Sequence, residues 1–253
     1  MGPERGALLS DMATFLVAHG AWTGGWFWHK MFRPLREFGH ELIVPTLTGL
    51  GERQHLANKG IGLDTHITDV LQVMHYEDLA KVTLIGHSYG GMVATGVADR
   101  AARRLNGVIY LDAFVPRSGE CLLDLLPYEA RSSMQEAARS EGDGWKVRPN
   151  PMPPDTTVDD VNWAIARRVA QPIKTFEQPL ELSDVSTGLA KAYIYCKRYA
   201  PGNVFRRFSE QAQREPDWNH VELDASHNPQ VTVPIELATL LDTLVREPAR
   251  RGV

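Results

Sequence analysis

The sequence predicts an α/β protein with a mostly parallel, doubly wound sheet and an inserted helical lid. Short apolar runs alternate with segments of helical spacing along most of the 253 residues. The runs are continuously apolar, which is typical of strands that are covered on both faces. One stretch of about 80 residues, between 111 and 191, has no convincing core strand, and its aliphatic and aromatic content favours a helical lid over a disordered loop.

The expected strands are the short apolar runs that end at glycine, proline or polar residues. The first run, ATFLVA, ends at His19-Gly20, and the second ends at Pro45. The predicted strands are residues 13–18, 41–44, 81–86, 107–111, 191–196 and 218–223.

Helices are expected where apolar residues recur at helical spacing. In the core these segments are residues 26–38, 65–74, 90–104 and 234–246, and in the lid they are residues 122–138 and 158–169, joined by a proline-rich link. We therefore predict a core of residues 12–116 and 187–246 and a helical lid of residues 117–186. Residues 1–11 are treated as an N-terminal extension, because Met12 directly precedes the first strand, and residues 247–253 as a C-terminal tail.

Composition excludes several classes of protein. With 43% apolar and 23% charged residues, the chain is neither disordered nor fibrous. A net charge of −4 gives no general attraction to nucleic acid or to anionic membranes, and no apolar run is long enough to span a bilayer. Cys121 and Cys196 form neither a disulfide framework nor a zinc pattern. No secretory signal is visible, so we expect a cytoplasmic enzyme with reduced thiols and with no nucleic-acid or membrane partner.

The strongest chemical signal is GHSYG at residues 86–90, which matches the G-x-S-x-G nucleophile elbow. A predicted strand precedes the motif and a predicted helix follows it, as the elbow requires. The tight turn would hold Ser88 in a strained conformation with its hydroxyl exposed. Ser88 is the predicted nucleophile; the alternative is an ordinary strand-to-helix turn.

A serine nucleophile needs a base, and the base follows the last strand in this architecture. His227 occupies that place and is the predicted base, although a surface-loop histidine is the alternative. His19, His87 and His220 lie in or beside strands, and we interpret them as structural. No H-E-x-x-H or similar spacing is present, so we expect no metal.

Four segments carry a family resemblance. They are HGAWTGGWFW at residues 19–28, GHSYGG at 86–91, AFVP at 113–116 and ASHNP at 225–229. With them the chain resembles an α/β-hydrolase, of the branch that contains plant methylesterases, hydroxynitrile lyases and bacterial pyrethroid-type carboxylesterases. The resemblance covers residues 12–246, and the first segment is the most specific to the branch. It implies the α/β-hydrolase fold, no cofactor, and an oxyanion hole made by the backbone amides of Ala21 and Tyr89.

The triad acid departs from the pattern of the branch, which usually has an aspartate just after the strand at 191–196. Here no carboxylate follows until Glu210. The preceding strand ends at Asp112, where the plant relatives have a small apolar residue, so we predict that the acid has moved to Asp112, as in haloalkane dehalogenases. The alternatives are Glu210, Asp217, Asp224 or no acid, with Asp112 serving as a helix cap or in a salt bridge.

The resemblance also limits the reaction. Hydroxynitrile lyases of this branch carry a lysine after the catalytic histidine, where this chain has Asn228, and dehalogenases use an aspartate nucleophile. We therefore predict hydrolysis of a small hydrophobic or aromatic ester through an acyl-enzyme. The alternatives are thioester or lactone hydrolysis or a lyase step with the same triad, and a small-molecule receptor without catalysis. A homodimer is the expectation from general frequency.

An apolar substrate pocket is expected beneath the lid. Its candidate lining residues are Trp22, Leu122, Leu126, Trp145, Trp163 and Phe176. For Trp26 and Trp28, packing in the core is the preferred interpretation.

Overall fold

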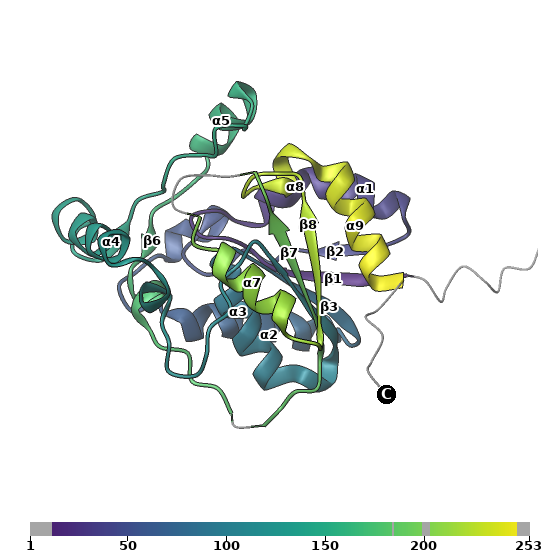
Figure 1. The fold of residues 1–253 in the computed structure, drawn as a ribbon. Coiled ribbons are helices and arrows are strands. Elements are labelled where there is room, and N and C mark those ends of the chain that lie inside the picture. Colours follow the sequence, from purple (N-terminus) through teal and green to yellow (C-terminus); the bar gives the residue numbers. More distant parts are fainter. Residues whose placement is uncertain (1–11, 184, 199–202, 247–253) are drawn as a thin grey trace, which may run out of the picture.

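A computed structural model describes residues 12–183, 185–198 and 203–246 (Figure 1). The predicted extension at 1–11 and tail at 247–253 lie outside these ranges. The centre of the molecule is a six-stranded sheet in the order β2-β1-β3-β4-β7-β8, and every pairing in it is parallel. The strands are β1 (Thr14–Ala18), β2 (Glu41–Ile43), β3 (Val82–His87), β4 (Leu105–Leu111), β7 (Ala190–Cys196) and β8 (Trp218–Leu223). The predicted α/β class and parallel sheet are confirmed, and strand ends differ from the predicted ones by two residues at most.

Alternate strand residues point to opposite faces of the sheet and build two hydrophobic clusters. Leu16 and Leu84 belong to the first cluster, whereas Val17 and Ile85 belong to the second. Helices α2 (Leu63–Tyr76), α3 (Gly90–Ala101) and α7 (Arg206–Arg214) contribute to the first cluster, and α1 (Phe32–Glu37) and α9 (Pro234–Arg246) to the second. Both faces are therefore covered, which explains why the strands are continuously apolar.

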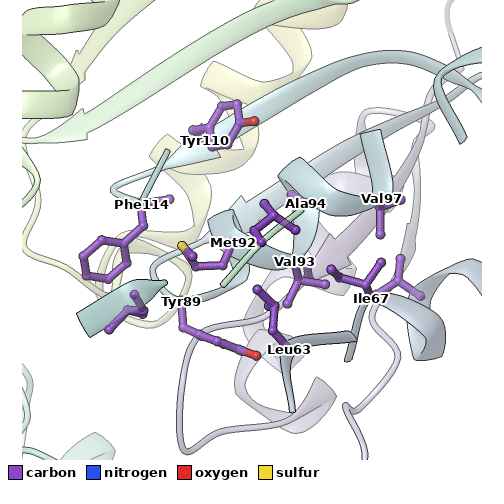
Figure 2. Packing of buried hydrophobic residues seen from close by; sticks show 14 of the residues in the cluster. Leu63, Ile67, Tyr89, Met92, Val93, Ala94, Val97, Tyr110 and Phe114 are labelled. Carbon is purple, nitrogen blue, oxygen red and sulfur yellow. The ribbon is translucent and has the colours of Figure 1, made fainter. Parts of the chain in front are cut away.

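The α2–α3 pair carries much of the first cluster. Figure 2 shows Leu63 and Ile67 of α2 next to Val93 and Val97 of α3, all of them buried. This packing fixes α3 against the sheet immediately after the predicted nucleophile, so the position of that turn depends on the core.

Prolines divide two segments that the periodicity predicts as continuous helices. Residues 26–38 form a 3-10 helix, Gly25–Met31, followed by α1, because Pro34 lacks an amide and its ring excludes the preceding α-helical turn. Residues 122–138 form a short 3-10 helix, Leu122–Leu125, followed by α4 (Tyr128–Glu141), with Pro127 at the boundary. Three further short helices of the core are Gly51–Leu56, Ala102–Arg104 and α8 (Pro229–Thr232).

The segment between β4 and β7 adds no strand to the main sheet in its described part. It contains α4, α5 (Val158–Ile165), α6 (Lys174–Glu177) and a small antiparallel pair of β5 (Lys146–Val147) with β6 (Gln171–Pro172), which the sequence analysis did not predict. Helix α5 ends four residues before the predicted end at 169. In Figure 1, α4 and α5 lie at the margin of the molecule, away from α9. The lid boundaries at 117 and 186 stay a prediction.

In the ranges that the structure describes, no helix is long and apolar enough to cross a bilayer. The same ranges hold no group of three or more His, Cys, Asp or Glu side chains arranged to bind a metal ion.

Candidate active site

The parallel register brings the predicted catalytic residues to one edge of the sheet. Ala18 at the end of β1 pairs with Gly86 of β3, and His87 pairs with Leu111 of β4. The loops that follow these three strands therefore emerge side by side. In sheets of this kind the carboxyl edge, at the point where strand order reverses, is where ligands bind.

Ser88 lies in the turn between β3 and α3 with φ of +55°, a strained conformation for a residue with a side chain. The turn is possible only because its neighbours are glycines. A Cβ on Gly90 would overlap the carbonyl oxygen of Ala18, and a Cβ on Gly91 would overlap that of Phe114. The local sequence thus dictates the predicted elbow.

A continuous hydrogen-bonded chain joins Ser88, His227 and Asp112. The Ser88 hydroxyl lies 2.9 Å from Nε2 of His227, and Nδ1 of His227 lies 2.7 Å from Oδ2 of Asp112. Because a carboxylate only accepts, Nδ1 carries the proton and leaves Nε2 free to accept the serine proton. This is the order and geometry of a nucleophile, its base and an orienting acid.

Asp112 is fixed at the end of β4 by the neighbouring strand. Its backbone amide donates to the Ile194 carbonyl at 2.8 Å, and its Oδ1 accepts from the Cys196 amide at 3.3 Å. Its side chain is only 3% exposed, whereas that of His227 is 26% exposed. The Phe205 ring stacks on the imidazole at 4.8 Å between centroids, so the histidine is held from its face as well as from its edge.

The other carboxylates considered as the triad acid lie elsewhere. Asp224 pairs with Arg198 at 3.1 Å, and Glu210 pairs with Arg206 at 3.1 Å, both at the surface. Asp217 is exposed and precedes β8, at the opposite edge of the sheet from the Ser88 turn. Of the candidates, only Asp112 contacts His227.

The backbone amides of Ala21 and Tyr89 flank the site as predicted for an oxyanion hole. Both residues line the same cavity as Ser88, and within the described residues neither amide donates a hydrogen bond. Unpaired amides beside the nucleophile can stabilise negative charge that develops on a substrate oxygen.

Trp22, directly after Ala21, has φ of +63° and is held by the inserted segment. Its amide donates to Oε1 of Gln171 at 2.9 Å, its indole donates to the Val147 carbonyl at 3.0 Å, and its carbonyl accepts from Val169 at 3.1 Å. Sequence analysis missed Gln171, because a glutamine 149 residues away carries no local signal of this contact.

Three buried histidines, His19, His66 and His87, contact or adjoin the loop after β1 and the Ser88 turn, and they remain neutral. Burial, and after it the neighbouring His227, lower the pKa of His87 to about 3. Burial likewise lowers the pKa of His19 and of His66 to about 4. The neutral His87 lies 2.8 Å, through Nε2, from the His227 carbonyl and donates to it, so it supports the base without adding a charge. His220 contacts Ser209 at 2.8 Å, away from the triad.

The cavity at the site has a volume of about 580 Å³, within the range of small-molecule sites. Four of the predicted lining residues are found in its wall: Trp22, Leu122, Leu126 and Phe176. Lining residues that sequence analysis missed include Phe27, Phe114, Met134, Arg168, Val204 and Phe205.

The prediction that Trp145 and Trp163 line this cavity is wrong. Trp163 packs edge-to-face on Trp26 at 4.9 Å and stacks on Phe27 at 6.0 Å, and so supports the wall from behind. Trp145 lies beside β5, with the Lys146 ammonium 4.7 Å above its ring. Both rings pack against other side chains instead of facing the cavity.

Comparison with known proteins matches residues 15–240 to the sequence model described as the alpha/beta hydrolase family. The chain is 38% identical over 242 residues to the carbendazim hydrolyzing esterase of a Nocardioides species, covering 92% of this chain and 100% of that one. It is 30% identical to salicylic acid-binding protein 2 of Nicotiana tabacum over 107 residues, 41% of this chain and 40% of that one. An extracellular alpha/beta-hydrolase structure from a Paenibacillus species superposes with a TM-score of 0.80 at 21% identity, over 95% of this chain and 100% of that one.

Proposed function

The chain belongs to the alpha/beta hydrolase family, and from that premise we propose that it is a serine carboxylesterase with Ser88, His227 and Asp112 as its triad. The observation that carries this proposal is the hydrogen-bonded chain from Ser88 through His227 to Asp112 at the wall of the cavity. Full-length similarity to an esterase supports the reaction class.

In the first half-reaction, Nε2 of His227 takes the Ser88 proton as the hydroxyl oxygen attacks the ester carbonyl carbon. The carbonyl oxygen becomes an oxyanion, which the amides of Ala21 and Tyr89 stabilise. His227 then gives its proton to the leaving alkoxide oxygen, so the alcohol departs and the acyl group remains on Ser88.

In the second half-reaction, His227 accepts a proton from water as that water attacks the acyl-enzyme. Its return of the proton to Ser88 releases the carboxylic acid. Asp112 keeps the imidazole in the tautomer with the proton on Nδ1 and stabilises the imidazolium. No cofactor takes part in these steps.

The cavity wall favours a small ester with an apolar or aromatic body. The rings of Phe27, Phe114 and Phe176 form part of the lining. Carbendazim, the compound named for the Nocardioides relative, is therefore a candidate substrate. No lysine lines the cavity in the described residues, and Asn228 occupies the position after the base, which disfavours cyanohydrin cleavage.

Thioester or lactone hydrolysis and a lyase step remain the alternative reactions, because they use the same triad. The close Ser88–His227 contact disfavours a receptor without catalysis.

A cytoplasmic location and a homodimer are also proposals. Cys121 and Cys196 are both free and buried, which supports the cytoplasmic location. Cell fractionation tests the location, and sedimentation analysis tests the homodimer.

The decisive experiment measures hydrolysis of p-nitrophenyl esters from acetate to octanoate, of carbendazim, and of a matched acyl thioester. Wild type is compared with Ser88→Ala and with Ser133→Ala, an exposed serine on α4, as the control. We expect turnover that is abolished in Ser88→Ala and retained in Ser133→Ala, with oxygen esters preferred over the thioester. Absence of turnover on every ester would contradict the proposal.

A further inference from the structure

One cation in the cavity wall, Arg168, has no acidic partner in the described structure. Its two terminal nitrogens donate to Asn150, to the carbonyl oxygen at 2.6 Å and to the side-chain Oδ1 at 2.8 Å. Its Nε is buried and has no hydrogen-bond partner. The guanidinium carbon lies 5.7 Å from the centre of the Trp22 ring. All of these neighbours are neutral.

The other arginine in the cavity wall, Arg198, differs from Arg168 because it has acidic partners. Arg198 pairs with Asp224 at 3.1 Å and with Asp155 at 3.6 Å. Arg168 has no such pair, and burial alone lowers its pKa to about 10, so it stays positively charged at neutral pH. A partly buried charge without a counter-ion is unfavourable, and an anionic ligand would relieve this cost.

Arg168 lies in the wall of the cavity that holds the proposed reacting centre. It packs against Trp22, which immediately follows the proposed oxyanion donor Ala21, and it lines the same cavity as Ser88. Asn150 lies in the same wall and leads into the proline-rich stretch 151–154, which also lines it. A guanidinium carries five N–H donors, and Asn150 uses two of them, so donors remain for a ligand.

We propose that Arg168 binds a carboxylate of the substrate, so that the preferred esters are monoesters of aromatic or apolar dicarboxylic acids. The proposal rests on the function proposed above and specifies its substrate class. A carboxylate fits the planar fork of a guanidinium and supplies the missing counter-ion, whereas a neutral acceptor supplies only a hydrogen bond. The phenylalanine-rich remainder of the wall takes the apolar body.

The test uses two pairs of esters of closely similar shape, in which a carboxylate replaces a neutral nitro group. The pairs are methyl 4-carboxybenzoate with methyl 4-nitrobenzoate, and the two 3-substituted counterparts. The measured quantity is the ratio of kcat/KM for the carboxylate ester to that for the nitro ester. The two esters of a pair differ in intrinsic reactivity, and comparing their ratio between wild type and variants removes this difference.

We expect Arg168→Met to lower this ratio by about 10- to 100-fold for at least one pair, as for loss of a charge-assisted hydrogen bond. Arg168→Lys keeps the charge but not the fork, so its ratio should fall in between. Arg167→Met is the matched control. Arg167 is exposed, donates to the Trp163 carbonyl and does not line the cavity. Its ratio should equal that of wild type.

An unchanged ratio in Arg168→Met for both pairs would overturn the proposal and leave Arg168 as a structural contact. Binding of benzene-1,4-dicarboxylate and of its neutral counterpart 1,4-dinitrobenzene, followed by tryptophan fluorescence, gives a second readout that needs no turnover. If wild type hydrolyses no ester yet binds the dicarboxylate more tightly than Arg168→Met does, the proposed esterase function fails while the carboxylate site stands.

Discussion

The side-chain oxygen of Gln171 accepts a hydrogen bond from the backbone amide of Trp22 at 2.9 Å, across 149 residues of sequence. The glutamine is itself oriented, because its Nε2 donates to Oγ1 of Thr175, which in turn donates to the Pro172 carbonyl, each at 2.8 Å. Gln171 is fully buried. The inserted segment therefore fixes the loop after β1 that carries the proposed oxyanion donor Ala21.

Replacing Gln171 with Met should lower catalysis more than substrate binding. The substitution leaves the Trp22 amide without its partner, which costs about 1–3 kcal/mol. Movement of the adjacent Ala21 amide weakens stabilisation of the oxyanion, for which one donor is worth about 10²–10³ in kcat. We expect kcat on p-nitrophenyl esters to fall by at least about 10-fold, with a smaller change in KM.

Gln54→Met, at an exposed position on the 3-10 helix Gly51–Leu56, is the control for this substitution and should match wild type. Wild-type kcat together with a wild-type melting temperature in Gln171→Met would show that the hydrogen bond does not position the loop.

Asp112→Asn should reduce kcat by about 10⁴-fold, the size of the effect when the acid of such a triad becomes an amide. The amide still fills the buried site, but it no longer stabilises the imidazolium or fixes the His227 tautomer. Asp224→Asn, which breaks only the surface pair with Arg198, should retain wild-type kcat. The opposite ranking of these two variants would move the acid to Asp224.

Most of the sheet could be predicted because burial on both faces requires continuous apolar runs, and these are visible locally. Two predicted helices are divided where proline interrupts the apolar periodicity, and Pro34 and Pro127 mark these breaks in the sequence itself. The pair of β5 with β6 has only two residues in each strand, too few to produce a pattern.

The residues of the candidate site also fall into two groups, those that local sequence identifies and those that it does not. Ser88 and Asp112 follow predicted strands, and His227 follows the last one, so strand ends and local motifs were sufficient to identify them. Gln171 and Arg168 come from the inserted segment, where polar residues carry no sign of what they contact. The mistaken placement of two tryptophans shows that apolar character predicts burial but does not identify the cavity.

Stability should fall as pH decreases below about 6.5, because His19, His66 and His87 are buried in neutral form. Their folded pKa values are about 4, 4 and 3, whereas an unfolded histidine titrates near 6.5. Between these values the unfolded chain binds more protons, so the free energy of unfolding rises with pH. Each histidine contributes about 1.4 kcal/mol per pH unit in that window.

Urea denaturation at pH 7.5, 6, 5.5 and 5 measures this slope. His66→Gln should flatten it, because it removes one buried imidazole, whereas His55→Gln, at an exposed site, should leave it unchanged. A free energy of unfolding that stays constant from pH 6 to pH 5 would contradict the neutral, buried state of these side chains.

Gly90→Ala should prevent the elbow from forming. Gly90 begins α3, and a Cβ there would overlap the Ala18 carbonyl oxygen at the end of β1. Neither backbone can yield without separating α3 from the sheet, so we expect a loss of at least about 1–3 kcal/mol in stability together with loss of esterase activity. Gly60→Ala is the control, since its added methyl meets no backbone atom and only Oδ1 of the Asn58 side chain, at 3.0 Å. Melting temperature and kcat are measured for both variants. A Gly90→Ala protein with wild-type values of both would show that the turn tolerates a side chain, and the steric basis for the strained Ser88 conformation would be lost.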